Sequence, residues 1–171
     1  MMFSLPDSPP APPLVEPALI TDLPPAPDRP AALRLAVEHL GRCGRLSDPA
    51  EVAAELVGRE RGGATALNNG YAIPHCRSGG VRFNSILIAR LAEPVDWMAP
   101  DGLPVRVMVV LAIRRPDFDF DHLKAVARLC RLLMQPGFRA RVAQRVPPAE
   151  LCREILAEVC PAPVEKLYCQ K

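Results

Sequence analysis

Residues 105–113 read VRVMVVLAI, and this segment decides the fold class of the 171-residue chain. Nearly every side chain in it is apolar, whereas a strand that meets water on one face alternates between apolar and polar residues. An apolar run of this length is typical of a strand covered on both faces. The segment therefore predicts the centre of a layered α/β domain.

Shorter segments on either side complete the expected sheet. YAIP (71–74) and SILIARL (85–91) also predict strands, while LVEPALITDL (14–23) fits either a short first strand or a linker. Helical spacing of apolar residues predicts helices around 33–40, 49–61 and 121–135, and a last helix from about residue 148. Together they predict an α/β layered sandwich, a mixed central β-sheet flanked by α-helices on both faces.

The ends of the helix at 49–61 are marked in the sequence. Asp48 can cap it, Pro49 suits the first helical position, and Glu51 can close a capping box. The glycines at 62–63 are expected to end it.

The helix at 121–135 has a two-sided pattern. One stripe is expected to face the core and the other water: Leu123, Val126, Cys130 and Leu133 against Lys124, Arg128 and Arg131. An aspartate at 119 or 121 can cap its start, and the proline and glycine at 136–137 are expected to end it. In the last helix Leu151, Ile155 and Val159 share the apolar side.

Composition excludes several classes of protein. A net charge of +2 and 5% aromatic residues argue against nucleic-acid binding. None of the six cysteines forms a C-x-x-C pair, so a zinc knuckle is not expected and the thiols fit a reduced protein. No signal peptide and no apolar run of membrane length is present, which predicts a cytoplasmic protein without membrane insertion. The proline-rich residues 1–13 are expected to form a flexible tail before one domain at 14–171.

His75, in the segment GYAIPHC (70–76), is the main candidate for a site. It can be a structural histidine, a metal ligand or a nucleophile. A metal site needs at least three ligands, and His39 is expected on the exposed side of its helix. The nucleophile is favoured by position, because Pro74 is expected to end a strand just before His75. His122 opens the helix at 121–135, where free N–H groups suit an anion.

Several separated segments carry a family resemblance. RERGGATALNNGYAIPHC (59–76), PVDWMAPDGLPVRVMVVLAI (94–113) and DHLKAVARLCRLL (121–133) resemble, in this order, the enzyme IIA domain of the fructose/mannitol type, including its nitrogen-related branch. This family belongs to the bacterial phosphoenolpyruvate-dependent sugar phosphotransferase system. The resemblance covers nearly all of residues 14–171, which it identifies as a type-2 IIA domain.

The resemblance implies a role for each matching residue. His75 would accept a phosphoryl group from phospho-HPr, His122 would support the site, and Arg59 would neutralise the phosphoryl charge. Thr65, Asn69 and Gly70 match a phosphoryl-binding loop. The resemblance implies no metal and no cofactor.

Some positions depart from the family. Ala64 stands where a first hydroxyl is usual, Asn68 where glycine is frequent, and Cys76 where a small residue follows the histidine. Cys76 is expected to be an inert packing residue, with a redox role as the alternative.

The family implies two partners. The protein would pass phosphate to an enzyme IIB, or it would be a free-standing nitrogen-type regulator whose phosphorylation controls binding to a target protein. A relative that binds without being phosphorylated is a third hypothesis. Tyr71, Ile73 and the start of the His122 helix are expected to form the docking surface for HPr.

Overall fold

The structure, a computed structural model, describes residues 11–117 and 121–160. Five strands and five helices follow a 3₁₀ turn at Pro17–Leu19. The strands are β1 (Ile20–Leu23), β2 (Tyr71–Ala72), β3 (His75–Ser78), β4 (Ser85–Val95) and β5 (Val105–Arg114). The helices are α1 (Arg29–Arg42), α2 (Pro49–Arg61), α3 (His122–Met134), α4 (Pro136–Ala143) and α5 (Pro148–Val159).

Strand β5 is the centre of the sheet. It pairs antiparallel with β4, and both β2 and β3 run parallel to it. Strand β1 lies on the far side of β4 and runs parallel to it. All residues from Val107 to Ile113 are buried, so the prediction of a central strand covered on both faces is confirmed. The segment at 14–23 also contributes a strand, which settles that alternative.

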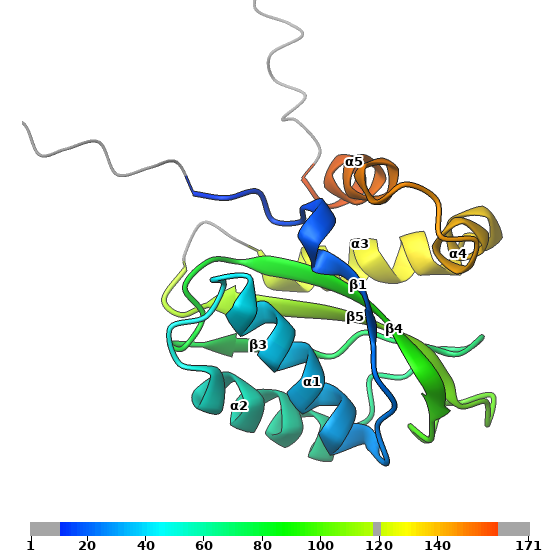
Figure 1. Cartoon of the computed structure of the whole chain (residues 1–171), viewed down its shortest axis with the longest axis horizontal. Helices are drawn as coiled ribbons and strands as arrows, with labels where there is room; N and C mark the ends of the chain where they lie inside the picture. The colour runs from blue at the N-terminus through cyan, green and yellow to red at the C-terminus, as the bar shows by residue number, and fades with distance from the viewer. Residues whose placement is uncertain (1–10, 118–120, 161–171) are drawn as a thin grey trace, which may run out of the picture.

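Helices cover both faces of this mixed sheet (Figure 1). The pair α1 and α2 lies on one face, where α1 packs on β4 and α2 on β3. Helix α3 lies on the other face and packs against α4 and α5. The predicted α/β layered sandwich is confirmed.

Of the two hydrogen bonds that make up the capping box predicted for α2, the one to Asp48 is confirmed and the one from Glu51 is wrong. Asp48 accepts a hydrogen bond from Glu51 N at 3.0 Å, as expected of an N-cap. The Glu51 carboxylate instead accepts from Ser78 Oγ at 2.7 Å and Gly79 N at 2.9 Å. The N–H of Asp48 donates to Gly80 O at 3.1 Å. Glu51 therefore ties α2 to the end of β3 rather than closing its own helix.

Helix α3 faces the core with a different stripe from the predicted one. Asp121 caps it, accepting from Lys124 N at 3.1 Å. Its buried residues are Ala125, Leu129, Leu132 and Leu133. Leu123 is 68% exposed and Val126 and Cys130 are half-buried, because the helix is rotated so that its first leucine reaches the surface. Helix α3 ends at Met134, just before the proline and glycine that were expected to end it, and Pro136 also opens α4, because its fixed φ suits the first helical turn.

Strand β3 was not predicted. We expected Pro74 to end a strand with His75 beyond it, but His75 is the first residue of β3. Leu111 N donates to Pro74 O at 2.9 Å, so pairing with β5 continues across the break between β2 and β3. The proline lacks an N–H, and it therefore interrupts the ladder without detaching the chain from the sheet.

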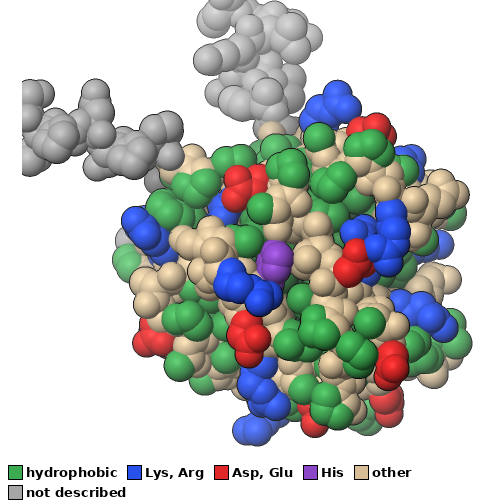
Figure 2. Space-filling view, in the orientation of Figure 1, with side chains coloured by type: hydrophobic (Ala, Val, Ile, Leu, Met, Phe, Trp, Pro, Cys, Tyr) green, Lys and Arg blue, Asp and Glu red, His purple; other side chains and the backbone are tan. Residues whose placement is uncertain are grey.

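The surface carries mixed charge. On the face drawn in Figure 2, acidic and basic side chains are interspersed with apolar ones and form no single basic stripe. No helix within the described ranges is both long enough and apolar enough to cross a membrane. Most of the predicted tail, and Asp119 as an alternative cap, lie outside the described residues.

Candidate functional site

The His75 side chain is held by one hydrogen bond on each ring nitrogen. Its Nδ1 lies 2.9 Å from the backbone carbonyl oxygen of Ile73. A carbonyl can only accept, so Nδ1 carries the proton and Nε2 keeps its lone pair. Arg59 Nε lies 3.3 Å from that Nε2 and donates to it. The arrangement leaves Nε2 as an unprotonated nitrogen beside a permanent positive charge.

Arg59 comes from the last turn of α2, sixteen residues before His75. Its Nη1 donates to Gly63 O at 2.9 Å, in the turn that ends the helix. Because α2 packs on β3, the helix end and the first residue of the strand meet. The guanidinium is thus fixed at both ends, by the helix turn and by the imidazole.

His122 shares the hollow with His75. The hollow has a volume of about 370 Å³ and is lined by Glu55, Arg59, His75, Cys76, Arg77, His122 and Leu123. Burial, followed by the positive charge of Arg77, holds the pKa of His122 below its ordinary value of 6.5. The neutral imidazole is therefore the predominant form of His122 at pH 7, and it can hydrogen-bond without adding a positive charge.

Two residues of this hollow were missed from the sequence. Arg77 stands two places after His75 on β3, and side chains at i and i+2 of a strand lie on the same face. This i, i+2 spacing would have identified Arg77 from the sequence only if β3 had been predicted as a strand. Glu55 lies on α2 and pairs with Arg115 at 3.2 Å.

Thr65 does not line the hollow around His75. Its hydroxyl donates to the carboxylate of Glu60, and its backbone N–H donates to the same group at 3.1 Å. Glu60 is only 3% exposed and also accepts from Trp97 Nε1 at 3.1 Å. This buried carboxylate anchors the loop that leads from α2 to the site.

Asn69 and Gly70 also lie outside this hollow and form a left-handed turn, with φ of 67° and 77°. Asn69 N donates to Asp101 at 2.6 Å, and Gly70 O accepts from Arg106 N at 2.7 Å. A Cβ on Gly70 would lie 3.2 Å from Pro104 O, so both the positive φ and the lack of space favour glycine at this position. The structure therefore brings His75, His122 and Arg59 together, and it places Thr65, Asn69 and Gly70 as loop supports.

The expected docking surface is partly wrong. Tyr71 is 6% and Ile73 2% exposed, so neither is available to a partner. Leu123, on the rim of the hollow, is the exposed apolar residue of the site. His39 is half-buried rather than exposed, with Nε2 2.7 Å from Ala18 O. Within the described ranges no three His, Cys, Asp or Glu side chains are placed to hold a metal ion.

Cys76 is expected to be chemically inert. It is 8% exposed, and burial raises its pKa to about 12, so at pH 8 only about one molecule in 10⁴ carries a thiolate. We expect iodoacetamide to alkylate Cys76 at least ~100-fold more slowly than the exposed Cys160, by peptide mass analysis. The unfolded chain in urea is the control, in which both should react alike. Comparable rates in the folded protein would contradict the packing role.

Comparison with known proteins agrees with this architecture. Residues 14–158 match the family described as phosphoenolpyruvate-dependent sugar phosphotransferase system, EIIA 2. The nitrogen regulatory protein of Pseudomonas aeruginosa is 33% identical over 112 residues, 66% of this chain and 71% of that protein. The multiphosphoryl transfer protein of Shigella flexneri is 35% identical over 108 residues, 63% of this chain but only 13% of that protein.

Solved structures show the same fold. The nitrogen regulatory protein IIA-Ntr of Neisseria meningitidis superposes with a TM-score of 0.71 at 27% identity, over 83% of this chain and 96% of that one. Enzyme IIA for mannitol from Escherichia coli, solved with phosphorylated enzyme IIB, matches with a TM-score of 0.65 at 21% identity, over 84% and 96% of the two chains, and shows the fold alone. From the matched span, the chain belongs to the EIIA 2 family of the phosphoenolpyruvate-dependent sugar phosphotransferase system.

Proposed function

We propose that this protein is a cytoplasmic histidine phosphocarrier in which His75 Nε2 accepts a phosphoryl group from phospho-HPr and passes it to an enzyme IIB. One observation carries the proposal. The hydrogen bond from Nδ1 to Ile73 O leaves the lone pair on Nε2, where Arg59 donates. A neutral imidazole with a fixed tautomer and an adjacent guanidinium is the arrangement that phosphoryl transfer between nitrogens requires.

The transfer balances without any further reactant. The Nε2 lone pair of His75 forms the new bond to phosphorus, and the phosphorus–nitrogen bond of the donor histidine breaks with its electron pair left on the donor. The Nδ1 proton stays in place, shared with Ile73 O. Arg59 then turns its donor from the nitrogen to the phosphoryl oxygens, whose charge it offsets.

The other family positions support this centre. His122 is neutral and can donate a hydrogen bond to the phosphoryl group. Thr65, Asn69 and Gly70 would act through the loop that they hold, the first through Glu60 and the other two through the 101–107 segment. The loop would set the depth of the hollow in which the phosphoryl group sits.

The test is a phosphorylation assay of the full chain with phosphoenolpyruvate, enzyme I and HPr. We expect a single acid-labile phosphoryl group by intact mass, and a phosphorus coupling to Nε2 rather than Nδ1 in the imidazole NMR spectrum. No mass shift, with HPr shown to be charged, would overturn the proposal.

A regulatory role of the same site is the second candidate. Nitrogen regulatory proteins are among the relatives that this chain covers over most of their length, 71% for that of Pseudomonas aeruginosa, although the fructose-like EIIA component of Escherichia coli is covered to 68%. In this role the phosphoryl charge on His75 would switch the binding of a target protein. Incubation of the phosphorylated protein with a purified enzyme IIB separates the two roles, since only a carrier would transfer its phosphoryl group to enzyme IIB.

Replacing Arg59 by lysine is expected to slow phosphorylation of His75 by about 10²-fold. Lysine keeps the charge but loses the fork that contacts both His75 and Gly63. Rapid-quench measurement of the transfer rate checks this. Arg61→Lys is the matched control, because Arg61 is exposed on the same helix turn and does not line the hollow. Equal rates for the two variants would remove Arg59 from the mechanism.

A further inference from the structure

The side chain of Arg77 carries a hydrogen-bond donor that no described residue satisfies. Its Nε is buried and has no hydrogen-bond partner among the described residues, the one such side-chain atom found there. Leaving a buried N–H without an acceptor destabilises the folded protein, so its retention calls for a cause. Arg77 lines the same hollow as His75, Arg59 and His122. A ligand that brings acceptor oxygens into this hollow would satisfy the group.

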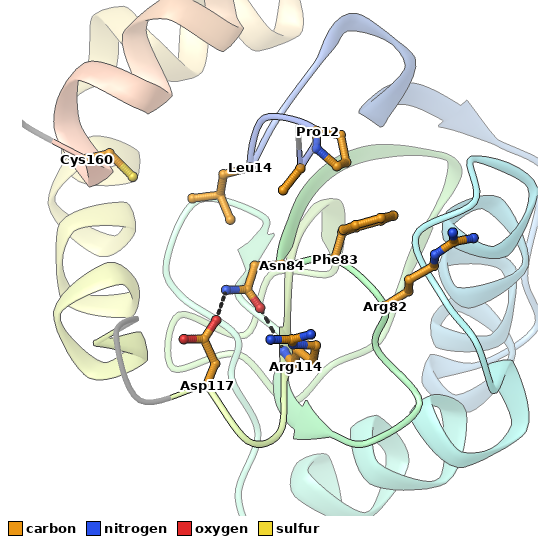
Figure 3. A pocket seen from close by; sticks show the side chains of 9 residues that line it. Pro12, Leu14, Arg82, Phe83, Asn84, Arg114, Asp117 and Cys160 are labelled. Atoms are coloured by element: carbon orange, nitrogen blue, oxygen red, sulfur yellow. Dashed lines mark hydrogen bonds between the residues drawn. The ribbon is translucent and has the colours of Figure 1, made fainter. Parts of the chain in front are cut away.

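The rest of the Arg77 guanidinium is held by the chain. Its Nη2 donates to the backbone oxygen of Asp117 at 3.3 Å. The position of Asp117 is fixed in turn by Asn84, which donates to the Asp117 carboxylate at 2.6 Å and accepts from Arg114 N at 2.8 Å (Figure 3). One end of the guanidinium is thus anchored through Asn84, just before β4, and through the end of β5, while Nε has no partner among the described residues.

The positive charge of Arg77 acts on the neighbouring His122 in the hollow. It is among the causes that hold the pKa of His122 low, after burial. Arg77 and Arg59 therefore place two permanent positive charges in the same hollow as the imidazoles of His75 and His122. A phosphoryl group on Nε2 brings about two negative charges and three acceptor oxygens, which two guanidiniums match better than one.

We propose that Arg77 is a further catalytic residue, which together with Arg59 binds the transferred phosphoryl group, through its Nε. The inference rests on the proposed phosphorylation of His75. In the unphosphorylated protein Nε has no partner among the described residues, and it gains one when the phosphoryl group binds. Arg77 thereby stabilises the transfer state and the phosphohistidine more than the free site.

The experiment compares Arg77→Gln and Arg77→Lys with the wild type in transfer from phospho-HPr. Arg153→Gln is the matched control, because Arg153 is exposed on α5 and does not line this hollow. We expect Arg77→Gln to slow phosphorylation at least ~10-fold, Arg77→Lys to recover part of the rate, and Arg153→Gln to leave it unchanged. The phosphohistidine of Arg77→Gln should also hydrolyse faster.

A purely structural role is tested by a second measurement. NMR titration of His122 should give a higher pKa in Arg77→Gln than in the wild type, because a positive charge facing that imidazole is removed. If the wild type is charged and Arg77→Gln is charged equally fast, the inference fails while the proposed function stands. If the wild type is never charged, the proposed function itself fails. Should Arg77→Gln not fold, wild-type behaviour of Arg77→Lys would overturn the inference.

Discussion

Replacing His75 by alanine is expected to abolish phosphorylation by phospho-HPr, with a rate at least ~10³-fold below the wild type. The substitution removes the nitrogen whose lone pair faces the Arg59 guanidinium. Folding should be little affected, because His75 is only half-buried and its hydrogen bond with Arg59 is exposed. Intact mass after incubation with the donor system measures the effect.

Two histidine controls make this result specific. His122→Ala should slow phosphorylation by about 10–10²-fold without abolishing it, since His122 assists and does not receive the group. His39→Ala should charge normally, because His39 lies on α1, contacts Ala18 O of the 3₁₀ turn and does not line the hollow. Residual charging of His75→Ala at the wild-type level would place the acceptor elsewhere and contradict the mechanism.

Replacing Glu60 by leucine is expected to lower the free energy of unfolding by about 3–5 kcal/mol. The buried carboxylate accepts from the backbone and hydroxyl of Thr65 and from the indole of Trp97, and it lies 3.6 Å from Arg29. Leucine fills a similar volume but leaves those donors buried without an acceptor. Urea unfolding, with the same slope in both proteins, measures the difference.

Glu93→Leu is the matched control, because Glu93 is exposed on β4 and its replacement should change stability by less than about 0.5 kcal/mol. Glu60→Gln should fall between the two, since it keeps an acceptor oxygen but loses the charge. A loss below about 1 kcal/mol for Glu60→Leu would mean that the loop is held by its packing alone.

Most of the layered fold could be predicted because it follows from local patterns. The continuous apolar run of β5, the cap at Asp48 and the apolar side of α5 are all properties of neighbouring residues. The failures depend on tertiary contacts. The rotation of α3 about its axis is set by the elements that pack against it. Strand β3 is too short and too polar to show the alternation of apolar and polar residues that predicts a strand.

For the site, too, some residues could be predicted from the sequence and others depend on tertiary contacts. His75, His122 and Arg59 were identified as a set through the family resemblance, and the fold then places them around one hollow. Arg77 was missed because its place depends on β3. The partner of Nδ1 could not be predicted, because a backbone oxygen two residues away has no signature in the sequence.

That backbone oxygen has a consequence for how the site can evolve. When a carboxylate side chain fixes a histidine tautomer, one nucleotide change can delete it, but every residue at position 73 supplies the same carbonyl. The choice of nitrogen is therefore insulated from substitution at that position and depends only on the path of the chain through Pro74. Relatives that diverge widely in side chains can keep the same reactive nitrogen, provided that the backbone between β2 and β3 keeps its shape.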